Sequence, residues 1–413
     1  MSRRVVVTGT GVISPVGNNT ETFWRNLLDG FCGIDYIQSM PTDDLPVKIA
    51  GEVKDFNPSD YGIEPAISRK QDRFTLFAIA ASYQAMKESG LDAGENGNID
   101  PYRLGVYVGS GIGGFSTQVK ETEKLLKDGP KWVSPLFIPT MIANIAAGTI
   151  AIRNKAYGPC LPVVTACATS THAIGEAYRA IRHGYADAII AGGTEATVLP
   201  IGIAGFANAK ALSRAEDPKY ASLPFSADRG GFVLSEGSAV LILEEYEHAK
   251  ARGAEIIAEV CGYGNTCDAY HATAPRPDGS TQAAAIKMAL DQAGYSSDDV
   301  LYINAHGTGT ALNDVTETMA FKLALGEDAY KAHISSTKSA MGHLLGAAGA
   351  AEALAAILAL RDGIVPPTIN LTNPDPELDL DYTPNTPVKA DLTIALSDSL
   401  GFGGHNSAIA FRK

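Results

Sequence analysis

The sequence predicts an α/β protein made of two similar halves, and three observations lead to this prediction. The chain has 413 residues, enough for two ordinary domains or one large duplicated core. Hydrophobic residues make up 45% of it and charged residues 19%, so the chain is globular and not disordered. Short apolar runs alternate with stretches of helical periodicity, and a similar series of runs begins again after residue 254.

In the first half, short apolar runs bounded by glycine, proline or polar residues predict strands. We expect these strands at residues 4–8, 104–108, 163–166, 186–191 and 239–244. Apolar residues at three- and four-residue spacing predict helices at residues 20–29, 72–89, 115–127 and 168–183. Glycine-rich segments after the first two strands imitate dinucleotide-binding loops. The first lacks the third glycine and the second lacks a later acidic strand end, so we do not expect nucleotide binding.

The second half repeats this order. We expect its strands at residues 255–262, 301–305, 334–338 and 406–412. In this order, they correspond to the strands expected in the first half at residues 4–8, 104–108, 163–166 and 239–244. The boundary falls near residues 245–254, which predicts halves of 1–250 and 251–413 with the chemistry at the seam between them. Residues 344–360 are rich in alanine and glycine and include Glu352, so we expect a buried core helix and not a membrane span.

Composition limits the class of function. The net charge is −13 and no basic tract is present, so nucleic-acid binding is not expected. The five cysteines form no CxxC pair and no metal-ligand spacing, which argues against a metal site and favours a reducing compartment. Residues 1–4 lack the apolar region of a signal peptide. We therefore expect a cytoplasmic protein that does not enter a membrane.

Cys167 is the candidate nucleophile. It follows the expected strand at 163–166 and precedes the expected helix, so its thiol lies near a helix N-terminus, where the helix dipole favours thiolate. A lone cysteine among small residues is more often a buried hydrophobe. Two glycine-rich histidine turns later in the chain favour the nucleophile instead.

The first of these turns carries His306 directly after an apolar run, in Asn-Ala-His-Gly-Thr-Gly-Thr. The second contains Lys338 and His343 in Ser-Ser-Thr-Lys-Ser-Ala-Met-Gly-His. A lysine in apolar surroundings is unusual unless it is paired. Taken alone, either histidine is equally compatible with a structural role. Phe402 lies among three glycines just before the last strand, where it is a poor core residue but a suitable hinge.

These motifs together resemble the β-ketoacyl-[acyl carrier protein] synthases of the thiolase superfamily, most closely the elongating type of bacterial fatty acid synthesis. Thr-Ala-Cys-Ala, Asn-Ala-His-Gly-Thr, Ser-Ser-Thr-Lys-Ser with Gly-His-Leu, and Gly-Phe-Gly-Gly occur in the family's order, and the resemblance spans the chain from Val5 to Phe411. The resemblance implies a duplicated thiolase-like fold with five αβαβα layers, and a homodimer. It also implies a decarboxylative condensation that lengthens an acyl chain by two carbons.

The resemblance also implies roles for individual residues. Cys167 would carry the acyl group, and the N–H groups of Cys167 and Phe402 would form the oxyanion hole, with Phe402 also serving as a gate. His306 and His343 would bind the malonyl thioester carbonyl, and Lys338 would order the site electrostatically. Further contacts implied are Thr308 and Thr310 to pantetheine, Ile112 and Phe206 to the acyl chain, and Arg69, Lys70 and Arg73 to acyl carrier protein. No metal or organic cofactor is implied beyond the phosphopantetheine arm that carries the acyl and malonyl thioesters.

Four positions depart from the family pattern. Asp398 stands where the family has Asn, Leu400 replaces Phe, His405 replaces Thr, and Gly309 replaces a common Ser. We expect these to affect chain-length preference and loop mobility. His405 either fills the loop or titrates with the site near pH 6.5.

Related enzymes give the main alternatives. A thiolase needs a second catalytic cysteine near the C-terminus, and none follows Cys267. Initiating synthases use Cys-His-Asn, whereas His343 fills the third place here. A polyketide-type ketosynthase subunit shares these motifs and stays open. A non-catalytic partner that sets chain length lacks the nucleophile, so Cys167 argues against it.

Overall fold

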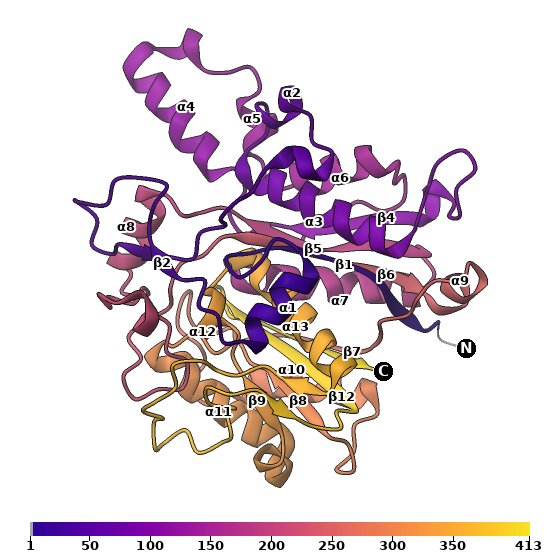
Figure 1. The fold of residues 1–413 in the computed structure, drawn as a ribbon, viewed down its shortest axis with the longest axis vertical. Helices are drawn as coiled ribbons and strands as arrows, with labels where there is room; N and C mark the ends of the chain where they lie inside the picture. Colours follow the sequence, from indigo (N-terminus) through magenta and orange to yellow (C-terminus); the bar gives the residue numbers. More distant parts are fainter. Residues whose placement is uncertain (1–2) are drawn as a thin grey trace.

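The computed structural model describes residues 3–413 (Figure 1). Within these residues the main sheet has nine strands in the order β4-β5-β6-β1-β7-β13-β12-β8-β9. Their bounds are β1 Val5–Ile13, β4 Leu104–Gly109, β5 Ala188–Glu195, β6 Gly237–Glu245, β7 Ala258–Cys267, β8 Leu301–Asn304, β9 His333–Ser335, β12 Ile394–Gly401 and β13 His405–Arg412. Two small sheets pair β2 (Asp35–Tyr36) with β3 (Ile49–Ala50), and β10 (Ile364–Val365) with β11 (Val388–Lys389).

The longer helices are α1 Thr20–Leu28, α3 Arg73–Ser89, α4 Phe115–Asp128, α6 Ile145–Asn154, α7 Thr169–Arg182, α8 Pro200–Asn208, α10 Ser280–Ala293, α11 Ala311–Leu325 and α13 Ala348–Asp362. The shorter ones are α2 Pro65–Ser68, α5 Phe137–Met141, α9 Tyr246–Ala251 and α12 Lys338–Met341. In residues 3–413 no helix is both long enough and apolar enough to cross a membrane.

The strands form two sets with the same pairing pattern. β1 pairs antiparallel with β6, β6 antiparallel with β5, and β5 parallel with β4. β7, β13, β12 and β8 repeat these directions in the same order. Only three residue pairs, between β1 and β7, join the two sets. The internal repeat predicted from the sequence is confirmed.

Helices fill three layers around these two sets. α7 and α13 pack against each other and against strands of both sets. α3 and α6 cover the outer face of the first set, and α10 and α11 the outer face of the second. Figure 1 shows α3 and α6 above the first set of strands and α7 and α13 in the middle of the molecule. The arrangement is the five-layer αβαβα architecture that the resemblance implied.

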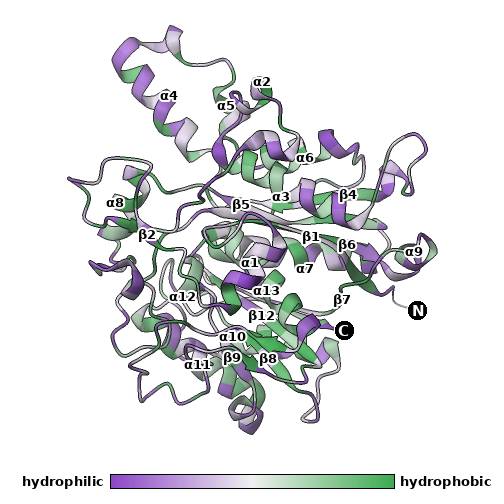
Figure 2. Cartoon of the chain, viewed as in Figure 1, coloured by the Kyte–Doolittle hydropathy of each residue, from purple (hydrophilic) through white to green (hydrophobic). Residues whose placement is uncertain are grey.

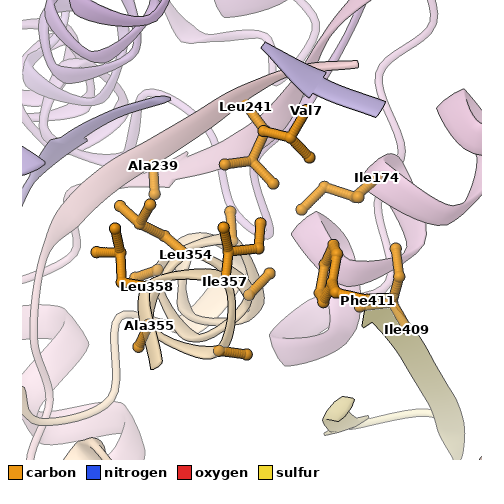
Figure 3. Packing of buried hydrophobic residues seen from close by; sticks show 14 of the residues in the cluster. Val7, Ile174, Ala239, Leu241, Leu354, Ala355, Ile357, Leu358, Ile409 and Phe411 are labelled. Carbon is orange, nitrogen blue, oxygen red and sulfur yellow. The ribbon is translucent and has the colours of Figure 1, made fainter. Parts of the chain in front are cut away.

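The centre of the molecule is α13. All its residues from Ala348 to Leu360 are buried, as expected of a helix placed between two sheets. Figure 3 shows Leu354, Ile357 and Leu358 facing side chains from both strand sets and from α7. Figure 2 shows the same apolar interior in green. Truncating Leu354 to alanine here would cost about 2–5 kcal/mol of stability.

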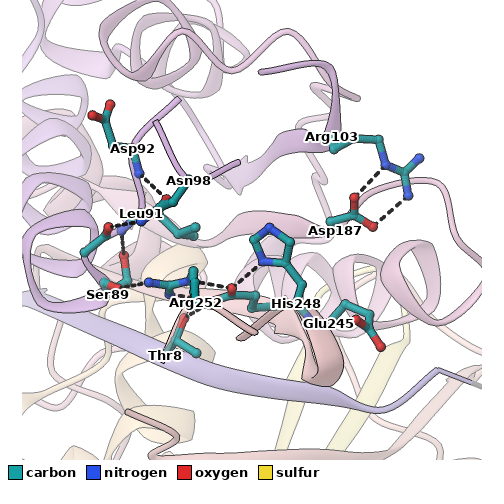
Figure 4. A network of polar contacts seen from close by, with 12 residues as sticks. Thr8, Ser89, Leu91, Asp92, Asn98, Arg103, Asp187, Glu245, His248 and Arg252 are labelled. Atoms are coloured by element: carbon teal, nitrogen blue, oxygen red, sulfur yellow. Dashed lines mark hydrogen bonds and ion pairs between the residues drawn. The ribbon is translucent and has the colours of Figure 1, made fainter. Parts of the chain in front are cut away.

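The segment between the halves is tied to the first half by polar contacts (Figure 4). Buried Glu244, near the end of β6, accepts hydrogen bonds from Thr8 Oγ1 at 2.8 Å and His248 Nδ1 at 2.6 Å. Arg252 also binds Glu244, with each of two nitrogens 2.7 Å from a carboxylate oxygen. The short helix α9 is thus held against β1 and β6.

Residues 163–166 are not the buried strand that the sequence predicted. The chain there runs beside β4 but is not part of a named strand. Just before it, Cys160 forms an isolated β-bridge with Val106 of β4. Val164 is 52% exposed. No other strand of residues 3–413 lies beyond this edge, so the segment lacks the partner that would bury it.

The glycines expected to follow a strand ending at residue 8 lie instead inside β1. A Cβ at Gly9 would lie 2.2 Å from the Ala85 carbonyl oxygen, and one at Gly11 would lie 2.0 Å from that of Ala81. Close packing of β1 on α3 therefore requires both glycines.

Candidate active site

A cavity of about 340 Å³ opens at the seam between the halves. The first half contributes Cys167 and Phe232, and the second contributes His306, His343 and Phe402, among others. Cys167, both histidines and the glycine-rich Phe402 loop therefore meet in one place, although more than 230 positions separate the first from the last. This is the juxtaposition that the sequence predicted at the seam.

Cys167 occupies a tight elbow. It is the middle residue of a 3₁₀ turn, Ala166–Ala168, that leads directly into α7. Ala166 has φ +51°, a left-handed conformation that a non-glycine residue adopts rarely. A Cβ at Gly401 would lie 2.5 Å from the Thr165 carbonyl oxygen, so glycine lets the Phe402 loop approach. The backbone N–H of Phe402 lies near the Cys167 sulfur and acts to lower the pKa of the thiol.

The predicted thiolate character of resting Cys167 is wrong. Burial of the sulfur raises the pKa of Cys167 to about 12, and the Glu195 and Glu352 carboxylates raise it further. Lys338 and the Phe402 N–H act in the opposite direction but do not compensate. Desolvation of the buried sulfur outweighs the favourable helix dipole here. The thiol therefore needs a proton acceptor when it attacks.

His343 can meet that need, and His306 lies beside it. Their ring centroids are 5.3 Å apart and nearly perpendicular, at 86°. Burial lowers the pKa of both imidazoles well below the usual value, and the Lys338 ammonium lowers them further. Both rings are therefore neutral near pH 7. Lys338 Nζ lies 3.3 Å from His306 Nδ1, and an ammonium only donates, so His306 carries its own proton on Nε2.

Two contacts fix these groups. Phe232 packs edge-on against His343, with centroids 5.1 Å apart. Lys338 forms an ion pair with Glu352 of α13, and both side chains are almost completely buried. The sequence predicted that Lys338 needed a partner, and Glu352 is that partner.

Some of the other predicted contact residues line the cavity, and others do not. Thr308 and Thr310 line the cavity, with their hydroxyl oxygens 3.0 Å apart. Phe206 stacks edgewise on Phe232 at 5.5 Å, in an apolar cluster that Cys167 also touches. Ile112 is 40% exposed and does not line this cavity.

Among the residues predicted to dock a carrier protein, Arg69 and Lys70 are exposed. Arg73 is also exposed, and its guanidinium binds buried Glu236 through contacts of 2.9 and 2.6 Å. The docking role of these three residues stays a prediction.

The departures from the family pattern also have structural settings. Leu400 lines the cavity. Gly309 has φ +73°, which a serine would adopt only with strain. His405 does not line the cavity, and its ring lies 6.2 Å from that of His172. Asp398 is buried inside β12.

Sequence reasoning missed Glu195. Its buried carboxylate accepts hydrogen bonds from the Ser110 hydroxyl at 2.8 Å and from the N–H groups of Gly111, Ile112 and Gly346 at 2.9, 3.2 and 3.1 Å. Burial nevertheless raises the pKa of Glu195 to about 7. The sequence feature that could have revealed Glu195 was an acidic residue at the end of an otherwise apolar strand.

Comparison with known families decides the identity of this site. The model described as "Beta-ketoacyl synthase, N-terminal domain" matches residues 2–249, and that described as "Beta-ketoacyl synthase, C-terminal domain" matches residues 257–372. The chain belongs to the β-ketoacyl synthase family. This synthase is accordingly an acyltransferase with a thiolase-like fold.

Individual relatives agree with that assignment. This β-ketoacyl synthase is 50% identical to a 3-oxoacyl-[acyl-carrier-protein] synthase 2 of Synechocystis, covering 100% of this chain and 98% of the relative. It is 47% identical to the Staphylococcus aureus protein of the same name, covering 100% and 99%.

Solved structures share the fold at lower identity. A β-ketoacyl synthase from Burkholderia phymatum is 33% identical, with a TM-score of 0.91 and coverage of 100% and 99%. A type II polyketide ketosynthase, solved with its acyl-carrier protein and bound to a hexaketide, is 36% identical, with a TM-score of 0.90 and full coverage of both chains.

Proposed function

We propose that this chain is an elongating 3-oxoacyl-[acyl carrier protein] synthase. One observation carries the proposal: Cys167, at a helix N-terminus, shares one cavity with neutral His306 and His343 and with the Phe402 loop. The 47–50% identity to proteins named 3-oxoacyl-[acyl-carrier-protein] synthase 2 supports this function over a polyketide subunit, because the polyketide ketosynthase is 36% identical.

The first step transfers the acyl group to the protein. The Cys167 sulfur attacks the thioester carbonyl of acyl-carrier protein, a neutral imidazole takes the thiol proton, and the carrier's thiol leaves with a proton. The N–H groups of Cys167 and Phe402 donate to the oxyanion. Phe402 is 37% exposed at the cavity, so its ring is placed to act as a gate.

The second step forms the carbon–carbon bond. The Nε2–H of His306, together with His343, binds the thioester carbonyl of malonyl-carrier protein. Loss of CO₂ then leaves an enolate whose charge these hydrogen bonds stabilise. The enolate carbon attacks acyl-Cys167, the C–S bond breaks, and the expelled Cys167 thiolate takes up a proton from water. The product is a 3-oxoacyl thioester two carbons longer.

Substrates enter as thioesters on the carrier's phosphopantetheine arm, and the chemistry proposed uses this chain's own side chains without a further cofactor. Thr308 and Thr310 are placed along the cavity to contact the arm. Phe206 and Ile112 are proposed to contact the acyl chain. Arg69 and Lys70 would dock the acidic carrier, and we place the reaction in the cytoplasm, where the five free cysteines would stay reduced.

We also propose that the chain forms a homodimer through the segment at residues 161–165. This segment runs along β4 at the edge of the sheet, where Leu161 N–H donates to Val106 O at 3.0 Å. Leu161 and Val164 are more than half exposed. An exposed extended edge pairs readily with another strand, and a second copy offers the identical edge across a two-fold axis.

A condensation assay tests the function. Purified protein is mixed with malonyl-carrier protein and acyl-carrier proteins of graded length, and products are identified by mass. We expect 3-oxoacyl-carrier protein and CO₂ in equal amounts. Release of CO₂ without a longer chain would contradict the proposal, and so would products extended repeatedly without reduction, which a polyketide subunit would give.

A further inference from the structure

His172 lies in the first turn of α7 and reaches back to the elbow that carries Cys167. It is 3% exposed. Its Nδ1 lies 2.9 Å from the Thr165 hydroxyl oxygen and 3.1 Å from the Ala168 carbonyl oxygen, both within hydrogen-bonding distance. One ring nitrogen therefore contacts residues on both sides of the nucleophile.

The turn at residues 165–168 depends on such contacts. Ala166 within it has φ +51°, and a non-glycine residue keeps this conformation only where its surroundings fix it. The Ala168 N–H closes the turn by donating to the Thr165 carbonyl at 3.1 Å, and the Thr165 N–H donates to Thr169 Oγ1 at 2.9 Å. His172 contacts the Thr165 hydroxyl and the Ala168 carbonyl, which these two bonds do not use.

The other side of the ring contacts the second half of the chain. His172 Nε2 lies 3.1 Å from Oδ1 of Asn265 on β7, a side-chain amide that can present either its oxygen or its nitrogen to the ring. Tyr263, also on β7, packs edge-on against the ring with centroids 6.3 Å apart. His405 of β13 does the same at 6.2 Å and 83°. Two strands of the second half thus hold the ring that contacts the turn.

His405 also places this ring beside the Phe402 loop. It is the first residue of β13 and pairs with Gly401, the last residue of β12. These two residues close the hairpin that carries Phe402, so the His172 ring borders the base of that hairpin as well as the elbow.

We propose that His172 is a positioning residue for the transfer of the acyl group to Cys167. It holds the turn at residues 165–168 in its strained conformation and ties that turn to the second half of the chain. His172 does not line the cavity, so it acts through the backbone of the elbow and not on the substrate.

This role affects one of the two steps. Acylation depends on the turn, because the Cys167 sulfur and the Cys167 N–H of the oxyanion hole both belong to it. Displacing a nucleophile by about 1 Å can slow a reaction roughly 100-fold. Decarboxylation of the malonyl group depends instead on His306 and His343, which lie on other segments of the chain.

Two variants separate the contacts of the ring. In His172→Asn the amide nitrogen lies as many bonds from Cα as Nδ1 does, so it can still donate to the Ala168 carbonyl. In His172→Gln the amide nitrogen corresponds to Nε2, so it reaches toward Asn265 and no longer contacts the turn. His183→Asn is the matched control, because His183 is an exposed histidine at the other end of α7.

Three quantities are measured: the acylation of Cys167 by acyl-carrier protein, the decarboxylation of malonyl-carrier protein, and hydrogen exchange along the chain. The maximal acylation rate of His172→Gln should fall at least about tenfold, at an unchanged half-saturating carrier concentration. His172→Asn should stay within about threefold of wild type, and His183→Asn should match wild type. Decarboxylation should change less than about twofold in every variant. Amides of residues 165–168 should exchange faster in His172→Gln than in wild type or His172→Asn.

Equal acylation rates in wild type and His172→Gln, or equal losses in His172→Gln and His172→Asn, would overturn the proposal. So would a shared loss of acylation and decarboxylation with faster exchange throughout the chain, since general destabilisation gives that result. The kinetic readouts rest on the proposed function, but hydrogen exchange does not. If wild type accepted no acyl group, the function would fail, and exchange at residues 165–168 would still decide whether His172 holds the turn.

Discussion

Two helix-starting elbows occupy equivalent places in the two halves. α7 begins after the 3₁₀ turn Ala166–Ala168, and α13 begins after the 3₁₀ turn Leu345–Ala347. Each turn opens with a non-glycine residue of positive φ, +51° at Ala166 and +49° at Leu345. Each helix lies in the central layer of helices. Each also follows the extended segment at the outer edge of its own half.

The elbows differ in what faces their middle residue. Cys167 faces the cavity and the N–H of Phe402. Gly346 occupies the matching position in the second elbow, and its N–H donates to the Glu195 carboxylate. A Cβ at Gly346 would lie 2.5 Å from Gly111 N and 2.7 Å from Glu195 Oε2. The duplicated fold thus provides two sites suited to an anion, and the protein's own carboxylate fills one of them.

The largest expected effect separates chemistry from structure at the first elbow. Cys167→Ala should lower condensation by at least ~1,000-fold, because Cys167 is the only thiol among the described residues that line the cavity. Its Tm should stay within a few degrees of wild type, since the substitution removes one sulfur atom. Condensation rates and thermal unfolding of the same preparation measure both; substantial residual condensation would show that Cys167 is not the acyl carrier.

Breaking the ion pair between α12 and α13 should damage the fold. Lys338→Met leaves Glu352 charged and buried, so we expect a loss of about 3–5 kcal/mol in the free energy of unfolding. The double variant Lys338→Met/Glu352→Leu should recover most of that stability without recovering condensation. Denaturant unfolding of both variants checks this. Equal stability of the two variants would contradict a dominant role for the unpaired charge.

At the second elbow, the expected loss is structural. Glu195→Ala leaves four donors without their acceptor, which should cost about 1–3 kcal/mol for each donor that water does not reach. Because burial raises the pKa of Glu195, the difference from wild type should depend on pH around 7. Removing this carboxylate should also let iodoacetamide alkylate Cys167 at lower pH. An unchanged alkylation profile would show that Glu195 does not influence the thiol.

The smallest expected effect concerns the exposed residues proposed to dock the carrier protein. Arg69→Glu with Lys70→Glu should raise the KM for carrier-bound substrate about three- to tenfold at low salt, and less at high salt. Arg73→Glu is the matched contrast, because it breaks the contact with Glu236 and should lower Tm. Steady-state kinetics at two salt concentrations distinguish them. An unaltered KM in the double variant would remove this patch from the docking surface.

The sequence predicted what is encoded locally. Motifs around Cys167, His306 and His343 identified groups that meet in the cavity. A further motif identified Lys338, which contacts His306. β12 was not predicted, because Ser397, Asp398 and Ser399 interrupt its apolar pattern although all three are buried.

What the sequence could not provide depends on contacts between distant positions. The raised pKa of Cys167 reflects desolvation by residues from both halves. Glu195 binds donors 85 positions before it and 151 after it. No local pattern predicts such pairings.

The central claim is that one elbow carries the acyl group and the other does not. Purified protein is incubated with an acyl-carrier protein in the absence of malonyl thioester, digested and mapped by mass spectrometry, with Cys167→Ala as the control. The account predicts a single acyl thioester on the peptide containing Cys167, absent from the control. Acylation of another cysteine, or condensation without any adduct on Cys167, would contradict it.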